Sequence, residues 1–336
     1  MLSAFVTGLA GTELTVREAA VLRDAAPCGI ILFARNVSDP EQVRRLTAAA
    51  REAVGDDILV LIDQEGGRVR RLTPPHWREL PPAAAYGVLY AEDAEGARRS
   101  AWAASRLLAQ DLRAVGINTN CTPVLDVPVP GSHDIIGNRA YGTGVGQVVA
   151  LARAVAEGHI AGGVLPVIKH MPGHGRATED SHLALPLVKA NRAELERTDF
   201  AAFRALADMP VAMTAHVVFE AIDPDHPAST SVRVTRDIMR TWIGFDGLLI
   251  SDDLGMKALS GGMAERAAAV IAAGSDIALV CSGEIADTEA VAGAVPRLDG
   301  LSQARFARAG AVLRQHGAFD VAEAEAHLQR ALHAVA

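Results

Sequence analysis

Short apolar runs recur along the chain, separated by longer stretches in which apolar residues return every three or four positions. Each run is continuously apolar instead of alternating, which is typical of strands that are covered on both faces. Eight such runs are present, at residues 4–9, 29–33, 58–62, 117–122, 165–168, 211–215, 247–250 and 276–280. The alternation of strand and helix patterns predicts repeated βα units on a parallel sheet.

The stretches between the runs carry helix start and stop signals. Asp39, Pro40 and Gln42 predict an N-cap, a first-turn proline and a capping residue, and Asn191 with Glu194 repeats the capping pattern. Three glycines stand where helix C-caps are expected, at Gly116, Gly244 and Gly274. These signals support helices between the predicted strands.

Eight strand and helix units over about 300 residues predict an α/β fold of the closed (β/α)8 TIM-type barrel kind, in preference to an open doubly wound sheet. The glycine fingerprint of dinucleotide-binding sheets and the P-loop pattern are both absent after the early strands. We expect a single catalytic domain over residues 1–336, with a helical tail from about residue 300 to 336 packed on it.

Charge and composition narrow the range of partners. The chain has 336 residues, is 50% hydrophobic and carries a formal net charge of −8. An acidic chain lacks the basic face that binding to nucleic acid or to an anionic membrane requires, so we expect neither partner. The net charge is compatible with a neutral or small anionic ligand.

Cysteine usage and the N-terminus bear on the compartment. The three cysteines, Cys28, Cys121 and Cys281, are far apart and odd in number, which favours a reducing compartment. Residues 1–14 have no basic region and include Glu13, so they predict a first strand and not a signal peptide. No apolar run approaches the roughly 20 residues of a membrane span. We therefore expect a cytoplasmic protein, and a monomer.

Polar side chains follow five of the predicted strands. In a barrel the carboxyl ends of all strands meet at one mouth, so side chains there are candidate site residues. They include Asp63, Gln64, Glu65, Arg68, Asp126, Lys169, His170, His216, Ser251, Asp252 and Asp253. One polar residue after a strand is usually a turn former, but charged or imidazole groups after five strands point to a site.

The densest polar segment spans residues 169–182. Proline and glycine exclude a regular helix over 172–175, which predicts that His182 lies on a long loop above the barrel. Asp180 stands two positions before His182, so its carboxylate could bond one ring nitrogen and orient the ring for acid/base work. The alternatives are a surface loop with incidental histidines, or a metal cluster built from His170, His174, His182 and His216.

Asp252 and Asp253 are adjacent carboxylates after an apolar run. They cannot both face the mouth in the same orientation, so one is expected to be a reactant or ligand and the other a cap. A buried carboxylate stays ionised only with charge or hydrogen-bond partners, which Lys169, Arg71 and Arg139 could supply. The alternative is that both aspartates cap the following turn.

At these residues the chain resembles the β-N-acetylglucosaminidases of glycoside hydrolase family 3, specifically the single-domain bacterial type of peptidoglycan recycling. The similarity covers nearly all of the predicted barrel, and its motifs are long and in order. They are GIILFARN at 29–36, IDQEGGRVRR at 62–71, PVLDV at 123–127, IGNRAYG at 136–142, KHMPGHGRATEDSH at 169–182, TAHV at 214–217 and GFDGLLISDDLGM at 244–256.

The resemblance implies a role for each matching position. Asp252 would be the nucleophile that forms a covalent glycosyl-enzyme, His182 the general acid/base, and Asp180 the partner that orients and tunes His182. The residues implied to bind the non-reducing N-acetylglucosamine are Asp63, Arg71, Arg139, Lys169, His170 and, as a lining residue, His216. The usual retaining pair of carboxylates, about 5 Å apart, is replaced in this family by a carboxylate and a histidine. Two positions depart from the family pattern: Met171 stands before the proline, where an aromatic or other apolar residue is common, and Arg176 lies inside the loop.

The implied activity is that of a retaining exo-β-N-acetylglucosaminidase that removes terminal β-1,4-linked N-acetylglucosamine from peptidoglycan fragments, with no cofactor and no metal. The preferred aglycone, a 1,6-anhydro-muropeptide or a chitooligosaccharide, is left open. Three other interpretations remain: phosphorolysis with phosphate in place of water, a metal-dependent barrel hydrolase, and a non-catalytic sugar-binding protein.

Overall fold

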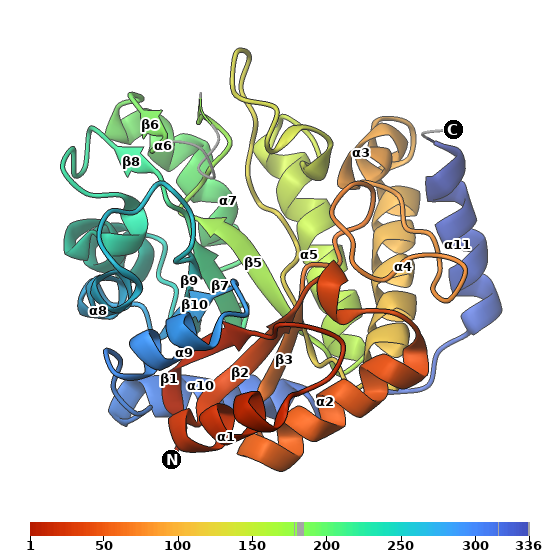
Figure 1. Cartoon of the computed structure of the whole chain (residues 1–336). Helices are drawn as coiled ribbons and strands as arrows, with labels where there is room; N and C mark the ends of the chain where they lie inside the picture. The colour runs from red at the N-terminus through yellow and green to blue at the C-terminus, as the bar shows by residue number, and fades with distance from the viewer. Residues whose placement is uncertain (178, 180–184, 315, 335–336) are drawn as a thin grey trace.

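The computed structural model describes residues 1–177, 179, 185–314 and 316–334. Its strands form a closed parallel barrel, which confirms the predicted (β/α)8 architecture (Figure 1). In order around the barrel they are β1 (Ser3–Gly8), β10 (Ile277–Val280), β9 (Leu248–Asp253), β7 (Val211–Thr214), β5 (Leu165–Met171), β4 (Thr119–Asn120), β3 (Leu59–Ile62) and β2 (Pro27–Leu32). A separate two-stranded sheet pairs β6 (Leu187–Val188) with β8 (Val218–Phe219), and the sequence analysis did not predict it.

Helices surround the barrel (Figure 1). They are α1 (Val16–Ala25), α2 (Pro40–Val54), α3 (Ala83–Glu92), α4 (Ala94–Ala114), α5 (Val145–Ala161), α6 (Arg192–Arg197), α7 (Asp199–Ala205), the π-helix η4 (Val234–Trp242), α8 (Met263–Ala272), α9 (Ile285–Ala292), α10 (Gly300–Val312) and α11 (Val321–His333). The short 3-10 helices are η1 (Ala34–Asn36), η2 (Gly137–Arg139) and η3 (Ala228–Thr230).

The predicted helix starts are confirmed. The Asp39 side chain accepts from the N–H groups of Glu41 and Gln42 at the start of α2, and Asn191 accepts from Glu194 at the start of α6. These bonds satisfy backbone donors that a helix N-terminus otherwise leaves without partners.

Two strands extend beyond the carboxyl ends of their predicted apolar runs, and β4 is much shorter than its run. Strand β5 continues through Lys169 and His170, and β9 continues through Asp252 and Asp253. These four residues therefore belong to the last residues of the strands and not to the loops that follow them. Strand β4 is reduced to Thr119–Asn120. An apolar pattern cannot reveal a polar strand end, because such an end becomes stable only when distant charges pair with it.

Apolar side chains fill the barrel interior, and α10 closes its amino-terminal end. Phe306 and Ala309 of α10 belong to the same buried cluster as Leu61 of β3, Leu165 of β5 and Leu248 of β9. Helix α11 packs on the outside instead, beside α4 (Figure 1). Among the described residues, α10 thus covers the amino-terminal end of the barrel, which leaves the carboxyl ends of the strands as the end open to a ligand.

No helix in the described part of the chain is long and apolar enough to cross a bilayer.

Candidate active site

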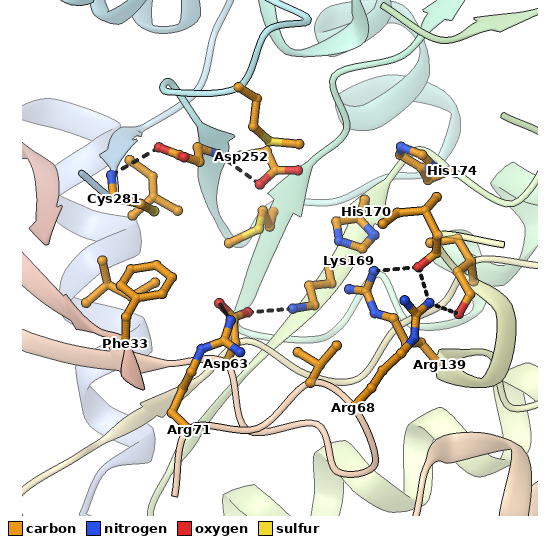
Figure 2. Close-up of a pocket in the computed structure, with 18 residues that line it drawn as sticks. Phe33, Asp63, Arg68, Arg71, Arg139, Lys169, His170, His174, Asp252 and Cys281 are labelled. Atoms are coloured by element: carbon orange, nitrogen blue, oxygen red, sulfur yellow. Dashed lines mark hydrogen bonds and ion pairs between the residues drawn. The ribbon is translucent and has the colours of Figure 1, made fainter. Parts of the chain in front are cut away.

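A pocket of about 230 Å³ opens at the carboxyl ends of the strands. This volume lies below the ~300–1,000 Å³ usual for drug-sized ligands, so the pocket suits one small ring. Its wall carries charged, imidazole and apolar side chains (Figure 2), from Ile31, Phe33, Asp63, Arg68, Val69, Arg71, Ile135, Ile136, Arg139, Lys169, His170, His174, Met213, Asp252, Asp253, Met256, Leu279 and Cys281.

One side of the pocket is a network of buried ion pairs. Lys169 Nζ donates to Asp63 Oδ1 at 2.8 Å and lies 2.7 Å from Glu65 Oε1. Arg139 donates two hydrogen bonds to the Glu65 carboxylate, from Nε to Oε2 at 2.9 Å and from Nη2 to Oε1 at 2.8 Å. Burial lowers the pKa of Lys169, but Asp63 and Glu65 outweigh this effect and raise it above its usual range. Lys169 therefore keeps its charge in the interior.

Arg71 connects this network to the aromatic ring of Phe33. Its Nη2 lies 3.4 Å from Asp63 Oδ2, and its guanidinium stands 5.4 Å from the centre of the Phe33 ring. Arg35 approaches the same ring at 4.8 Å. Cation–π contacts with both guanidinium groups therefore help to hold the Phe33 ring in its position on the pocket wall.

His170 is oriented by a buried aspartate. Its Nδ1 lies 2.7 Å from Asp126 Oδ2, and Asp126 Oδ1 also accepts from the backbone N–H of His174 at 2.6 Å. Burial raises the pKa of Asp126, but His170, the largest of the opposing influences, and His174 bring it below its ordinary value. Because the ionised carboxylate can only accept a hydrogen bond, Nδ1 of His170 carries the hydrogen, and Nε2 is the ring nitrogen that faces a ligand.

Asp252 faces the pocket from the end of β9 (Figure 2). Its Oδ1 accepts from the backbone N–H of Asp253 at 2.8 Å. Burial raises the pKa of Asp252, but His216, His170, that N–H and Lys169 more than compensate and lower it. Asp252 is thus held ionised in a buried site, as a nucleophilic carboxylate requires.

Asp253 has a different environment from its neighbour. Its Oδ1 accepts from the backbone N–H groups of Gly255 and Cys281, each at 3.0 Å. Burial, the largest influence, raises its pKa. Both aspartates line the pocket, but only Asp253 also accepts from two backbone N–H groups outside the pair, so it organises the backbone around Asp252.

The predicted site residues are mostly brought together. Six line the pocket: Asp63, Arg71, Arg139, Lys169, His170 and Asp252. His216 is fully buried and, among the described residues, is not part of the wall. Its Nε2 bonds the carbonyl of Asp253 at 3.0 Å and its Nδ1 bonds Ser229 Oγ at 2.6 Å, so it supports the aspartates from behind. Asp180 and His182 lie outside the described residues.

The partners expected for Asp252 differ from those observed. Of the three cations considered, Lys169 contributes to its charge stabilisation, whereas Arg71 pairs with Asp63 and Arg139 with Glu65. The sequence analysis counted Glu65 and Asp126 among the candidate side chains at the mouth but assigned neither a specific role. Their positions just past predicted strands were the only signal available.

The stem of the 172–182 segment is anchored by an arginine. Residues 172–177 form turns and coil, in agreement with the sequence prediction. Arg176 Nε donates to the buried Asp199 at 2.6 Å, its Nη2 donates to Thr198 at 3.1 Å, and its Nη1 lies 2.7 Å from Glu194. Arg176, one of the two residues that depart from the family motif, therefore links residues 172–177 to α6 and α7.

The part of the chain that the structure describes contains no group of three or more His, Cys, Asp or Glu side chains arranged to hold a metal ion. The histidine cluster considered above includes His182, which is outside that part.

Comparison with known proteins identifies the family. The profile of the Glycosyl hydrolase family 3 N terminal domain matches residues 7–314. The chain belongs to glycosyl hydrolase family 3. The resemblance found in the sequence is confirmed, and the chain is a glycoside hydrolase.

Several known proteins resemble the chain along most of its length. A β-hexosaminidase of Bordetella pertussis is 39% identical over 283 residues, 83% of this chain and 80% of that protein. NagZ from Neisseria gonorrhoeae, solved in complex with N-trifluoroacetyl-D-glucosamine, has a TM-score of 0.86 and 32% identity over 99% of this chain and 97% of its own. A family 3 β-N-acetylglucosaminidase from Paenibacillus has a TM-score of 0.80 and 33% identity, covering 99% of this chain and 62% of that one.

Proposed function

We propose that this family 3 enzyme is a retaining exo-β-N-acetylglucosaminidase with Asp252 as its nucleophile. The observation that carries the proposal is the setting of Asp252, an ionised carboxylate at the end of β9 that faces a pocket for one small ring. The β-hexosaminidase and β-N-acetylglucosaminidase names of its relatives support the choice of sugar.

The proposed reaction has two steps. Asp252 attacks the anomeric carbon, the glycosidic bond breaks, and His182 gives a proton to the departing oxygen. His182 then takes a proton from water, whose oxygen attacks the same carbon and releases Asp252. Asp180 orients and tunes His182. A histidine suits this role because its pKa lies near neutrality and its neutral form does not repel the anionic nucleophile.

The proposed sugar-binding residues are Asp63, Arg71, Arg139, Lys169 and His170, with His216 reassigned to support Asp252 and Asp253 from behind. A pocket of about 230 Å³, in a barrel plugged by α10, favours an exo enzyme that takes one terminal sugar. Charged donors and acceptors around the wall suit a ring rich in hydroxyl groups.

We further propose that the substrate is a peptidoglycan fragment carrying terminal β-1,4-linked N-acetylglucosamine, and that the enzyme works in cell-wall recycling in the cytoplasm. The net charge of −8 agrees with a small-molecule partner and not with nucleic acid or a membrane surface. A monomer of one catalytic domain remains our prediction.

The first test is hydrolysis of an aryl β-N-acetylglucosaminide, followed by mass spectrometry after trapping with a 5-fluoro-glycosyl reagent. Wild type should be active and carry the adduct on the peptide that contains Asp252, and Asp252→Ala should have neither activity nor adduct. Asp225→Ala, which removes an exposed carboxylate, is the matched control and should behave as wild type. An active Asp252→Ala enzyme would overturn the assigned nucleophile.

The acid/base role of His182 is tested with two leaving groups. His182→Ala should reduce hydrolysis of poor leaving groups far more than that of activated aryl glycosides, because only the poor ones need a proton from the enzyme. Equal losses on both substrates would contradict this role. Repeating the assay with phosphate separates hydrolysis from phosphorolysis, since only the latter yields a sugar 1-phosphate.

A further inference from the structure

Glu65 is a buried carboxylate behind the pocket wall. Its side chain is only 7% exposed, and it is not among the described residues that line the pocket. Glu65 also lines a small cavity whose other lining residues include Leu80, Tyr86 and Tyr141. A carboxylate in such surroundings has little access to water and depends on protein partners to remain ionised.

Those partners are two cations that do line the pocket. Arg139 Nε donates to Oε2 at 2.9 Å and Nη2 to Oε1 at 2.8 Å, while Lys169 Nζ lies 2.7 Å from Oε1. Burial raises the pKa of Glu65, but Lys169 and Arg139 reverse the effect and hold the pKa far below its usual range. The two-point grip fixes the plane of the guanidinium as well as its position.

Asp63, two positions earlier, provides an internal comparison. It lines the pocket, accepts from Lys169 at 2.8 Å through Oδ1, and meets Arg71 only at 3.4 Å through Oδ2. A carboxylate has about four acceptor positions. Asp63 therefore has capacity to accept a bond from a ligand, whereas Glu65 turns both oxygens to the two cations.

The local backbone fixes where Glu65 points. Its N–H donates to Val69 at 2.9 Å, and Gly66 follows with a φ of +107°. A Cβ at Gly66 would stand 2.3 Å from the carbonyl oxygen of Pro81, so only glycine fits this turn. The Gln64 side chain closes the loop by accepting from the N–H groups of Arg71 and Leu72.

We propose that Glu65 is a positioning residue that holds Arg139 and Lys169 in the orientation that binds the non-reducing sugar. The inference rests on the proposed function, since it concerns the sugar subsite of that reaction. Glu65 acts through the two cations and makes no contact with substrate itself.

The expected signature is a loss of binding, because the cations meet the sugar in both the ground state and the transition state. In Glu65→Gln the amide offers one acceptor where the carboxylate offered two, and its NH₂ group opposes the cationic donors. Hydrogen bonds to charged groups are strong enough that kcat/KM should fall by about 10- to 100-fold. Most of the fall should appear as a higher KM, with kcat changed by less.

The experiment compares four proteins on the aryl β-N-acetylglucosaminide, well below their melting temperatures, with binding of N-acetylglucosamine measured by calorimetry. They are wild type, Glu65→Gln, Glu65→Asp and Glu79→Gln. Glu65→Asp keeps the charge on a shorter arm and should lie between wild type and Glu65→Gln. Glu79→Gln removes the partner of Arg70 in a more exposed arginine–glutamate pair and should match wild type.

A double-mutant cycle tests whether Glu65 acts through Arg139. If it does, adding Glu65→Gln to Arg139→Met should cost clearly less than Glu65→Gln costs alone. An unchanged KM and unchanged sugar affinity in Glu65→Gln, or full additivity in the cycle, would overturn the proposal. If Glu65→Gln does not fold, Glu65→Asp alone decides, by a raised or an unchanged KM. An inactive wild type would count against the proposed function, whereas an active wild type with a normal Glu65→Gln counts against Glu65 alone.

Discussion

The two sides of the pocket are held by different kinds of interaction. On one side, Lys169 and Arg139 are fixed by ion pairs between side chains, to Asp63 and Glu65. On the other, Asp253 accepts from backbone N–H groups of Gly255 and Cys281, and Asp252 accepts from the N–H of Asp253. We call these the ion-pair side and the backbone-held side.

The difference has a chemical meaning. Ion pairs hold several charged side chains in place at once, where they can hydrogen-bond to the hydroxyl groups of a sugar ring. Because the site holds little water, each charge is stabilised mainly by its ion-pair partner. Backbone bonds hold Asp252 with few side-chain partners, so its second oxygen is presented to the pocket. The ion-pair side is thus suited to binding, and the backbone-held side is suited to a single reactive group.

The largest effect is expected on the backbone-held side. Asp252→Asn keeps the shape of the side chain but removes the nucleophile, so kcat should fall by roughly 10⁴-fold or more, as happens when a catalytic group is deleted. Stability should change little, since Asn also accepts the N–H of Asp253. Single-turnover kinetics with urea unfolding would measure both. A strongly destabilised but active variant would reverse the assignment of roles to the two sides.

Lys169→Met should damage stability most on the ion-pair side. Asp63 and Glu65 would each lose a cation, and breaking a buried pair costs about 3–5 kcal/mol. Urea unfolding should show a lower midpoint with an unchanged slope. Adding Glu65→Gln to Lys169→Met should restore part of the loss, because one uncompensated buried charge disappears; a further loss of similar size would contradict the coupling.

Acidification should weaken the fold around the ion-pair side. His159 bonds Asn120, which in turn bonds the backbone of Gln64, and burial lowers the pKa of His159 to about 4. The unfolded chain takes up this proton near pH 6.5, so stability falls as the pH drops from 6.5 towards 4, by up to about 3 kcal/mol from this group.

The check is unfolding measured across that pH range for wild type and His159→Gln. The variant should show a shallower loss, while His174 and His216, whose pKa values are also lowered by burial, continue to contribute. Parallel pH dependences would exclude His159 as a source.

The smallest effect is expected from His216→Ala. It removes the bond to the Asp253 carbonyl and leaves Ser229 without that partner, which should cost about 1–3 kcal/mol of stability. We expect kcat to fall about tenfold, since one hydrogen bond is lost behind the nucleophile, and KM to stay near its wild-type value. A selective rise in KM would return His216 to the sugar-binding residues.

Several features followed from the sequence alone. Continuous apolar runs predicted eight buried parallel strands, because strands covered on both faces need no polar alternation. Capping residues such as Asp39 and Asn191 predicted helix starts, because their bonds are made within a few positions of the chain. The motifs carried the family, and the barrel geometry placed Asp63, Lys169 and Asp252 at one mouth.

The tertiary structure decided which charged groups pair and which remain for a ligand. Lys169 meets Asp63 across 106 positions of sequence, and Arg139 meets Glu65 across 74. It also placed His216 behind the aspartates. Local patterns cannot specify such pairings, because the energy of a buried charge depends on every neighbour within a few ångströms, and these neighbours arrive from separate strands only when the barrel closes.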